Sequence, residues 1–162
     1  KRILVTCSGC VYSPRSRSII FFLDKYLKLE NIKFTIHSCI VKCCSDKIFI
    51  FREYVKTKNL NPQQLTIKKQ ASIIWDNRFL ISSIFSDIKC LIFDDIIWLK
   101  LKKQYKFVKD TNNIPYDILK TLPVLLYKNK MMIPFLTNNE IMTSFGISVI
   151  FKPKIPLTKK NL

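Results

Sequence analysis

A single amphipathic helix followed by short β-rich runs limits the folds open to this sequence. Ser13-Pro14 is a typical helix start, and apolar residues recur at helical spacing after it, which predicts a helix over Pro14 to Glu30. Two β-forming runs, Phe34–Cys44 and Lys47–Glu53, flank Ser45-Asp46 and predict a hairpin. A helix followed by a hairpin indicates an α+β fold and argues against a series of alternating βα units.

A small β-rich unit is predicted to follow the helix and hairpin. Short β-forming runs recur in the second half of the chain, and the last pair flanks Lys128-Asn129-Lys130 as a second hairpin. Before the helix, Arg2 to Cys7 is interpreted as a short buried strand or the end of an apolar segment. The predicted regions are a helix-and-hairpin region over 1–55, a polar linker over 56–64, a β-rich unit over 65–152 and a basic tail over 153–162.

The segment RILVTCSGCVYS, Arg2 to Ser13, looks like a damaged nucleotide-binding loop of the form SGGxDS. Such a loop needs glycines, because backbone N–H groups must approach the phosphate without side chains in the way. Cys10 replaces its second glycine, Tyr12 replaces its acidic residue, and the whole chain has only two glycines. We therefore predict no nucleotide site in this segment.

The chain carries a large positive charge. It has 28 Lys and Arg against 11 Asp and Glu, a formal net charge of +17. Such a charge favours polyanions, either nucleic acid or an anionic membrane face. Lys, Ile, Asn and Phe are all abundant, as in proteins of AT-rich genomes, so a solvated coat of lysines is the alternative. No segment is long and apolar enough for a membrane helix, and we expect no membrane partner.

Three arginines are candidates for nucleic-acid contact. Arg15 and Arg17 lie at the predicted helix start, where free N–H groups also favour phosphate. Arg78 is the third candidate, but it lies beside Trp75 and Phe79 and equally fits a structural cation–π or ion-pair role.

A second basic segment, Ile96 to Phe107, interleaves lysines with Trp98 and Tyr105. This pattern suits a surface that follows a nucleic-acid backbone and stacks bases. For each single lysine, a solvated side chain is the alternative. The full set of predicted nucleic-acid-binding residues is Arg15, Arg17, Arg78, Lys100, Lys102, Lys103 and Lys106.

No group of residues predicts catalysis or metal binding. His37, the single histidine, lies on a predicted strand with no Ser or Asp partner, and Asp94-Asp95 fits a turn or cap. The six cysteines include one CxxC motif, Cys7 and Cys10, whereas structural zinc usually needs two such pairs. We predict free thiols in a reducing cytoplasm and no catalytic, cofactor-binding or metal-binding residue, with a small metalloprotein as a remaining alternative.

Five segments of the chain, taken in order, carry motifs that belong together: SGCVYSPRSRSI (8–19), FTIHSC (34–39), KIFIFRE (47–53), IIWDNRF (73–79) and TLPVLLYKNKMMIPFL (121–136). In this order they resemble motifs of one family, tRNA(Ile)-lysidine synthase, in its C-terminal half and in the form common in alphaproteobacteria. Some family glycines are replaced: His37-Ser38 stands where the family has Gly-Gly, and Asn77 stands at a turn glycine. Pro134-Phe135 stands where the family has Pro-His.

The resemblance implies part of an ATP-dependent ligase. Members of this family adenylate C2 of the wobble cytidine of tRNA(Ile) and join free lysine there, using an N-terminal pyrophosphate-loop domain that binds ATP. This chain would correspond to the portion that binds tRNA, so we expect tRNA(Ile) as its partner and no activity from the chain alone. Because it begins at Lys1 instead of Met, we expect it to be a fragment of a longer cytoplasmic protein.

Two further interpretations stay open from the sequence. The chain could be a stand-alone RNA- or ribosome-binding protein, which its charge also fits. It could also be a non-functional relic, which the lost glycines fit. The sequence does not distinguish a monomer from a homodimer, so both oligomeric states stay open.

Overall fold

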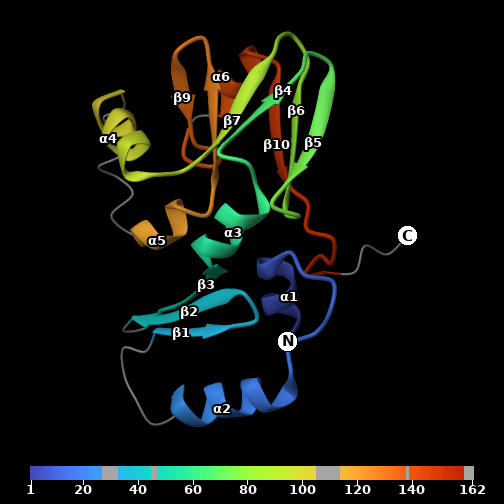
Figure 1. The fold of residues 1–162 in the computed structure, drawn as a ribbon, viewed down its shortest axis with the longest axis vertical. Helices are drawn as coiled ribbons and strands as arrows, with labels where there is room; N and C mark the ends of the chain where they lie inside the picture. Colours follow the sequence, from blue (N-terminus) through green and yellow to red (C-terminus); the bar gives the residue numbers. More distant parts are fainter. Residues whose placement is uncertain (27–32, 45–46, 105–113, 138, 159–162) are drawn as a thin grey trace.

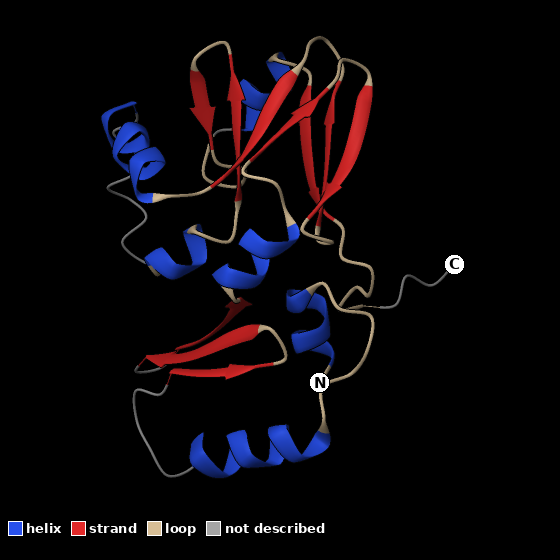
Figure 2. Ribbon diagram, viewed as in Figure 1, coloured by secondary structure: helices blue, strands red, loops and turns tan. Residues whose placement is uncertain are grey.

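The computed structural model describes residues 1–26, 33–44, 47–104, 114–137 and 139–158. Within these ranges the chain forms six helices and ten strands, and the strands make three small antiparallel sheets. The fold is therefore α+β, as predicted. A helix-and-hairpin unit comes first, and a larger β-rich unit follows it (Figures 1 and 2).

The first unit packs two helices against a three-stranded sheet in the order β1-β2-β3. Its core joins Leu4 to Ile36, Cys39 and Val41, with Phe22 packed against it. At the foot of the molecule, α2 lies below the sheet (Figure 1). The elements are α1 (Arg2–Ser8), α2 (Ser16–Tyr26), β1 (Lys33–Ile36), β2 (Cys39–Cys44) and β3 (Lys47–Arg52).

Two predictions for this unit need correction. The segment predicted as a strand before the helix is α1, which ends at Gly9 with φ +64°. A short apolar run fits a strand or a buried helix equally well, so periodicity could not decide. The predicted run Phe34–Cys44 is also broken, because His37 and Ser38 have φ values of 52° and 59°. Two successive positive φ values form the tight turn of a hairpin, here β1–β2.

The second unit contains two sheets, with strand orders β10-β6-β5 and β4-β7-β8-β9. Its helices are α3 (Tyr54–Leu60), α4 (Asp95–Gln104), α5 (Tyr116–Leu119) and α6 (Asn139–Ser144). Its strands are β4 (Gln64–Ile67), β5 (Ala71–Trp75), β6 (Phe79–Ser83), β7 (Ile88–Ile92), β8 (Pro123–Tyr127), β9 (Lys130–Met132) and β10 (Ile147–Phe151).

Two apolar cores hold this unit together. The first lies between the sheets and includes Trp75, Ile81 and Leu125, all buried. The second includes Phe93 and Leu101, where α4 and α5 pack against the four-stranded sheet. The predicted hairpin around Lys128-Asn129 is present, with Tyr127 paired to Lys130. Asn77 takes the positive φ of a turn glycine, 56°, which asparagine tolerates.

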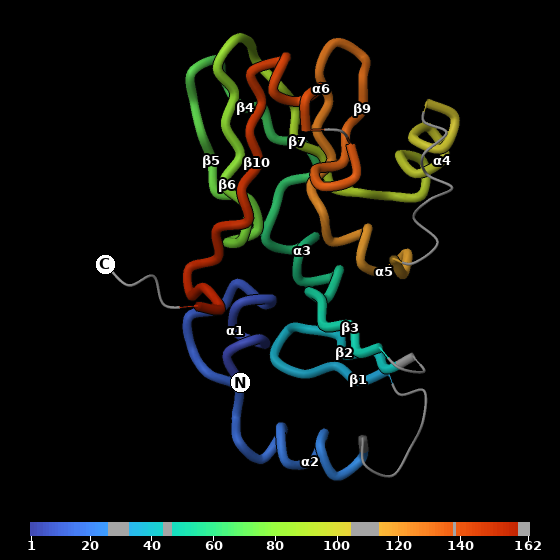
Figure 3. The backbone as a smooth tube through the Cα atoms, turned by 180° about the vertical axis from the view of Figure 1, so that it is seen from behind, coloured from blue at the N-terminus to red at the C-terminus, as the bar shows by residue number. Residues whose placement is uncertain are grey.

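Part of the segment predicted as a linker is helical. Thr57 of α3 is fully buried, and its hydroxyl donates a hydrogen bond to Asp76 over 3.0 Å. The described part of the basic tail packs against α1 at the back of the molecule (Figure 3). There the Thr6 hydroxyl donates to the carbonyl of Ile155 over 2.9 Å. The tail therefore connects the second unit to α1 of the first unit.

Candidate nucleic-acid interface

A groove lies between the N-terminal half of α2 and the β1–β2 turn. It consists of two adjoining hollows of about 440 Å³ and about 370 Å³. Ser18, Ile36 and His37 line both hollows. We call this surface the α2 groove; its other walls include Tyr12 and Arg15 on one side and Arg17, Phe21 and Phe34 on the other.

The rim of the α2 groove is cationic. Arg15 and Arg17 are both exposed, and Lys1 is held at the same helix start by a 2.8 Å hydrogen bond from its ammonium to the Ser16 hydroxyl. No acidic side chain lines either hollow. The N-terminal end of a helix adds a partial positive charge. The groove is thus suited to an anion such as a phosphate group.

The inner wall of the groove carries an aromatic pair. The rings of Tyr12 and His37 meet edge to face, with centroids 5.1 Å apart, and Tyr12 is 65% exposed. Within the described residues, Nε2 of His37 is buried and has no hydrogen-bond partner. Burial lowers the pKa of His37, and a hydrogen bond to the Tyr12 backbone opposes this only in part. The imidazole is therefore neutral at pH 7.

His37 and Tyr12 were not among the residues predicted to bind nucleic acid. The sequence interpretation placed His37 on a strand as a structural residue, whereas the structure places it at a turn facing a groove. The signal that could have indicated the turn is the replacement of a family Gly-Gly pair at this position. The local sequence around Tyr12 gives no sign that it contacts His37, because the two residues meet only through tertiary packing.

The second predicted basic segment lies far from the α2 groove. Lys100 and Lys103 are exposed on α4, and α4 and α2 occupy opposite ends of the molecule (Figures 1 and 3). Trp98 packs against Phe93 and Tyr116, and the Lys102 ammonium lies 5.0 Å from the centre of its ring. Trp98 is therefore a partly buried packing residue, with the Lys102 ammonium close to its ring. Lys106, with Tyr105, falls outside the described residues.

Arg78 has the structural role that the sequence left open. It is 4% exposed, and its Nε donates to Oδ2 of Asp76 over 2.9 Å. Its Nη2 also donates to the carbonyl of Thr121 over 2.8 Å. Arg52 lies on the other side of Asp76, with its Nε 3.3 Å from Oδ1, and also donates to the carbonyl of Ser8. We call Arg52, Asp76 and Arg78 the junction cluster and leave Arg78 out of the proposed interface.

The segment that imitates a nucleotide-binding loop does not form a phosphate cradle. Gly9 faces the protein, where an added Cβ would lie 3.1 Å from both Arg78 Cγ and the Asp76 carbonyl oxygen. The Ser8 hydroxyl donates to the carbonyl of Val5 over 3.0 Å and accepts from the Cys10 amide. The Ser8 hydroxyl is thus used within the end of α1 and Gly9 packs against the junction cluster, so this segment does not fit ATP.

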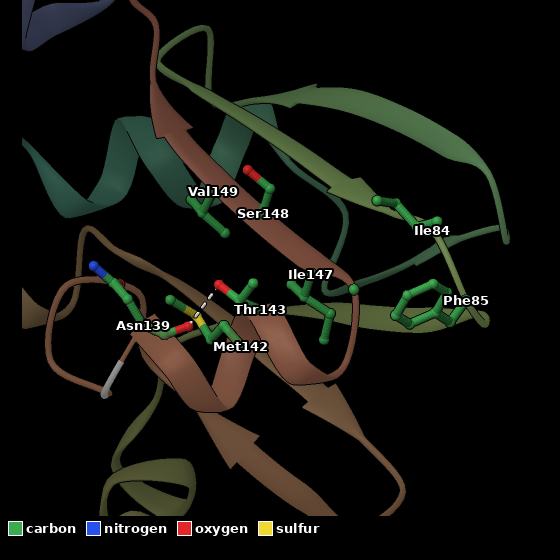
Figure 4. Close-up of a pocket in the computed structure, with 9 residues that line it drawn as sticks. Ile84, Phe85, Asn139, Met142, Thr143, Ile147, Ser148 and Val149 are labelled. Carbon is green, nitrogen blue, oxygen red and sulfur yellow. Dashed lines mark hydrogen bonds between the residues drawn. The ribbon is translucent and has the colours of Figure 1, made fainter.

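A further hollow of about 540 Å³ lies in the second unit, between α6, β10 and the turn after β6 (Figure 4). Its walls include Ile84, Phe85 and Met142, and no titratable side chain lines it. Within it, the Thr143 hydroxyl donates to the carbonyl of Asn139 over 2.9 Å. The hollow therefore offers shape and apolar surface without groups for acid–base chemistry.

The described part of the chain contains neither a metal-binding group nor a membrane-spanning helix. No group of three or more His, Cys, Asp or Glu side chains there is arranged to hold a metal ion. None of the helices found there combines the length and the hydropathy that a membrane span requires.

Comparison with known proteins connects the chain to one family. No family model matches it, and no solved structure matches it significantly. The tRNA(Ile)-lysidine synthase of Rickettsia prowazekii (strain Madrid E) is 30% identical over 159 residues, which are 93% of this chain and 35% of that protein. The synthase of the same name from Rickettsia bellii (strain RML369-C) is 30% identical over 154 residues, 90% of this chain and 35% of its own length.

A third relative shows the same pattern. The tRNA(Ile)-lysidine synthase of Rickettsia akari (strain Hartford) is 30% identical over 135 residues, 80% of this chain and 30% of that protein. The chain thus spans only 30–35% of the length of these curated relatives. Over most of its own length, this chain is related to the tRNA(Ile)-lysidine synthases.

Proposed function

We propose that this chain is the C-terminal, tRNA-binding part of a tRNA(Ile)-lysidine synthase. The observation that carries the proposal is the α2 groove, in which Arg15 and Arg17 flank an aromatic wall that has no acidic residue. The names of the relatives specify tRNA(Ile), which has the anionic backbone that such a rim favours.

In this proposal Arg15 and Arg17 contact phosphates and fix the position of the RNA on the first unit. Phosphate contacts position a nucleic acid without reading its sequence. Lys100 and Lys103 on α4 would make separate contacts, which requires an RNA long enough to reach both ends of the protein (Figure 1). A folded tRNA has that size, whereas a short oligonucleotide does not.

The chemistry of the ligase is assigned to another part of the protein. The loop at Gly9 faces the protein interior and forms no phosphate cradle, and we propose that ATP and lysine bind elsewhere in the full enzyme. The purified chain should therefore bind tRNA(Ile) but neither hydrolyse ATP nor form lysidine. Either activity from the chain alone would contradict this division of labour.

The test is a binding titration of the purified chain with tRNA(Ile) at several salt concentrations. The double variant Arg15→Gln with Arg17→Gln should bind at least several-fold more weakly. Its salt slope should fall by about 1.5, since each lost phosphate contact contributes roughly 0.7–0.9. A matched control removes two exposed lysines after β4, Lys68→Gln with Lys69→Gln, at the opposite end of the molecule from α2.

Three results would contradict the proposal. The wild-type chain could fail to bind tRNA at physiological salt. The arginine and lysine double variants could lose affinity equally, which would indicate a general effect of net charge. Equal affinity for tRNA(Ile) and for a short oligonucleotide would contradict a binding surface that needs an RNA long enough to reach both ends of the protein.

A further inference from the structure

We propose that an aromatic pocket between the two units binds one unpaired base of an RNA, with Phe135 as the ring on which that base stacks. The pocket has a volume of about 340 Å³ and shares no lining residue with the α2 groove. The inference rests on the proposed function, because it takes RNA as the ligand. It adds a second contact, which recognises an unpaired nucleotide, to the phosphate contacts of the α2 groove.

The pocket lies where the lower ends of β6 and β10 approach α1 (Figure 1). We call it the junction pocket. Both units contribute to its walls, so it exists only when they are packed together. Its main lining residues are Cys7 of α1, Phe51 of β3, Phe79 of β6, Phe151 of β10 and Phe135 from the turn after β9.

Two phenylalanine side chains of the junction pocket are exposed to solvent. Phe135 is 55% exposed and Phe151 is 43% exposed, and both contact the buried ring of Phe79. The ring centroid of Phe79 lies 6.0 Å from that of Phe135 and 5.4 Å from that of Phe151. Exposed apolar surface beside a hollow usually marks a binding site. Flat aromatic rings are the surfaces on which proteins stack unpaired bases.

The backbone holds Phe135 in a conformation that a bulky residue rarely adopts. Residues Ile133 to Leu136 form a turn, closed by a 3.2 Å hydrogen bond from the Leu136 amide to the Ile133 carbonyl. Phe135 is the third residue of this turn, after Pro134, and its φ is 70°, where glycine is usual. Burial does not compensate for this strain, because Phe135 is largely exposed. Strained residues of this kind tend to occur at ligand sites.

The charges around the junction pocket favour an anionic ligand over an apolar protein segment. Arg78 lines the pocket, and within the junction cluster two guanidinium groups share the single carboxylate of Asp76. None of the described lining residues is acidic. Lys152, the exposed residue after Phe151, is fixed beside the pocket by a 2.6 Å hydrogen bond from its amide to the Arg78 carbonyl. A nucleotide combines a flat base for the rings with a phosphate for this positive field.

The size of the junction pocket decides which part of an RNA can enter it. Its volume of about 340 Å³ is small even for a pocket that binds a small molecule. A double helix is too wide for it, and the bases inside a helix are already paired and stacked. The ligand is therefore a single unpaired nucleotide, which a folded tRNA offers in its loops and at its single-stranded end.

The test compares the affinity of the chain for tRNA(Ile) with its affinity for a blunt RNA duplex, which has no unpaired base. Phe135→Gly suits the positive φ, so this variant should fold at least as stably as the wild type, which thermal unfolding checks. Its affinity for tRNA(Ile) should fall about tenfold, a typical loss for one base–aromatic stack. Affinity for the duplex and the salt slope should stay unchanged, because no phosphate contact is removed.

Three further variants make the test specific to the ring. Phe135→Tyr keeps an aromatic ring and should bind tRNA(Ile) as tightly as the wild type. Phe85→Ala is the matched control, because it removes a similarly exposed phenylalanine from the separate hollow beside α6 and should change neither affinity. Phe135→Asn repeats the test if glycine disturbs the turn, since asparagine also tolerates positive φ.

Unchanged affinity for tRNA(Ile) in both Phe135→Gly and Phe135→Asn would overturn the inference. An equal loss for tRNA(Ile) and the duplex, or an equal loss in Phe85→Ala, would also overturn it, because neither depends on an unpaired base at Phe135. If the wild-type chain binds no tRNA at all, the proposed function itself fails, which differs from tRNA binding that does not depend on Phe135.

Discussion

Asp76 and Arg78 form an ion pair that is almost completely buried, with Arg78 Nε donating to Asp76 Oδ2 over 2.9 Å and exposures of 1% and 4%. Arg52, from the end of β3, approaches the same carboxylate from the first unit. One buried carboxylate therefore faces two buried guanidinium groups where the two units meet. This arrangement makes Asp76 the residue on which the junction depends most.

Replacing Asp76 with asparagine should destabilise the chain strongly. Two buried arginines would lose their counter-charge, and breaking a buried pair in this way typically costs about 3–5 kcal/mol. Urea unfolding followed by tryptophan fluorescence, to which the buried Trp75 contributes, would measure the change. The matched control is Asp87→Asn, which removes an exposed ion pair with Lys68 and should change stability far less. Equal effects from the two variants would contradict the role of the cluster.

Alanine should be tolerated worse at Gly9 than at Gly146. Both glycines have positive φ, 64° and 67°, so alanine carries a backbone cost of about 1–2 kcal/mol at either site. At Gly146 the new Cβ would meet the ring of Phe85, which is 60% exposed and can move into solvent. At Gly9 it would lie 3.1 Å from the backbone oxygen of Asp76 and from Cγ of Arg78, whose guanidinium is buried and hydrogen-bonded within the junction cluster. Thermal unfolding tests this prediction, since the Gly9→Ala variant should have the lower melting temperature. A lower melting temperature for Gly146→Ala would contradict it and would show that the junction cluster shifts to accept the new Cβ.

Glycine at Ser38 should stabilise the chain. Ser38 has a φ of 59°, and glycine removes this strain while increasing the freedom of the unfolded chain, for a net gain of about 0.5–1 kcal/mol. Ser72→Gly is a suitable control, because Ser72 lies exposed within β5, where glycine should destabilise. Chemical denaturation compares the two. A loss of stability in Ser38→Gly would contradict this prediction. It would mean that a contact of the serine side chain stabilises the fold by more than the positive φ destabilises it.

The thiols of Cys39 and Cys90 should resist alkylation in the folded protein. Burial raises the pKa of each to about 12, and the reactive form is the thiolate. At pH 8 both are protonated and inaccessible, so iodoacetamide should modify Cys10, which is partly exposed, long before either of them. Mass spectrometry of the labelled chain measures the order, and denaturant should make all three react. Early labelling of Cys39 in the native chain would contradict the packing of α1 on β2.

The parts of the fold that local pattern determines were predictable. The apolar spacing after Pro14 predicted α2, and the turn residues Lys128-Asn129 predicted the hairpin of β8 and β9. The helix α1 was missed because seven residues are too few to show a period, and α3 was missed because its burial depends on Thr57 reaching Asp76. Both errors concern segments whose structure is set by distant contacts.

The candidate site was only partly predictable for the same reason. Arg15 and Arg17 were found because charge at a helix start is visible in the sequence. The groove behind them needs His37, from a turn, to meet Tyr12, from the segment before α2, and no sequence spacing reports that contact. Arg78 shows the opposite case, because a basic residue between aromatic residues was equally consistent with a surface contact and with the buried pair that it forms.

The most direct measurement of where RNA binds is ultraviolet cross-linking of tRNA(Ile) to the chain, followed by mass spectrometry of the linked peptides. Tyr12 lies exposed in the α2 groove, so the peptide that contains it should carry the strongest cross-link. That cross-link should weaken in the Arg15→Gln, Arg17→Gln variant. Cross-links confined to the β-rich unit, with none at Tyr12, would contradict the assignment of the α2 groove as the tRNA-binding surface.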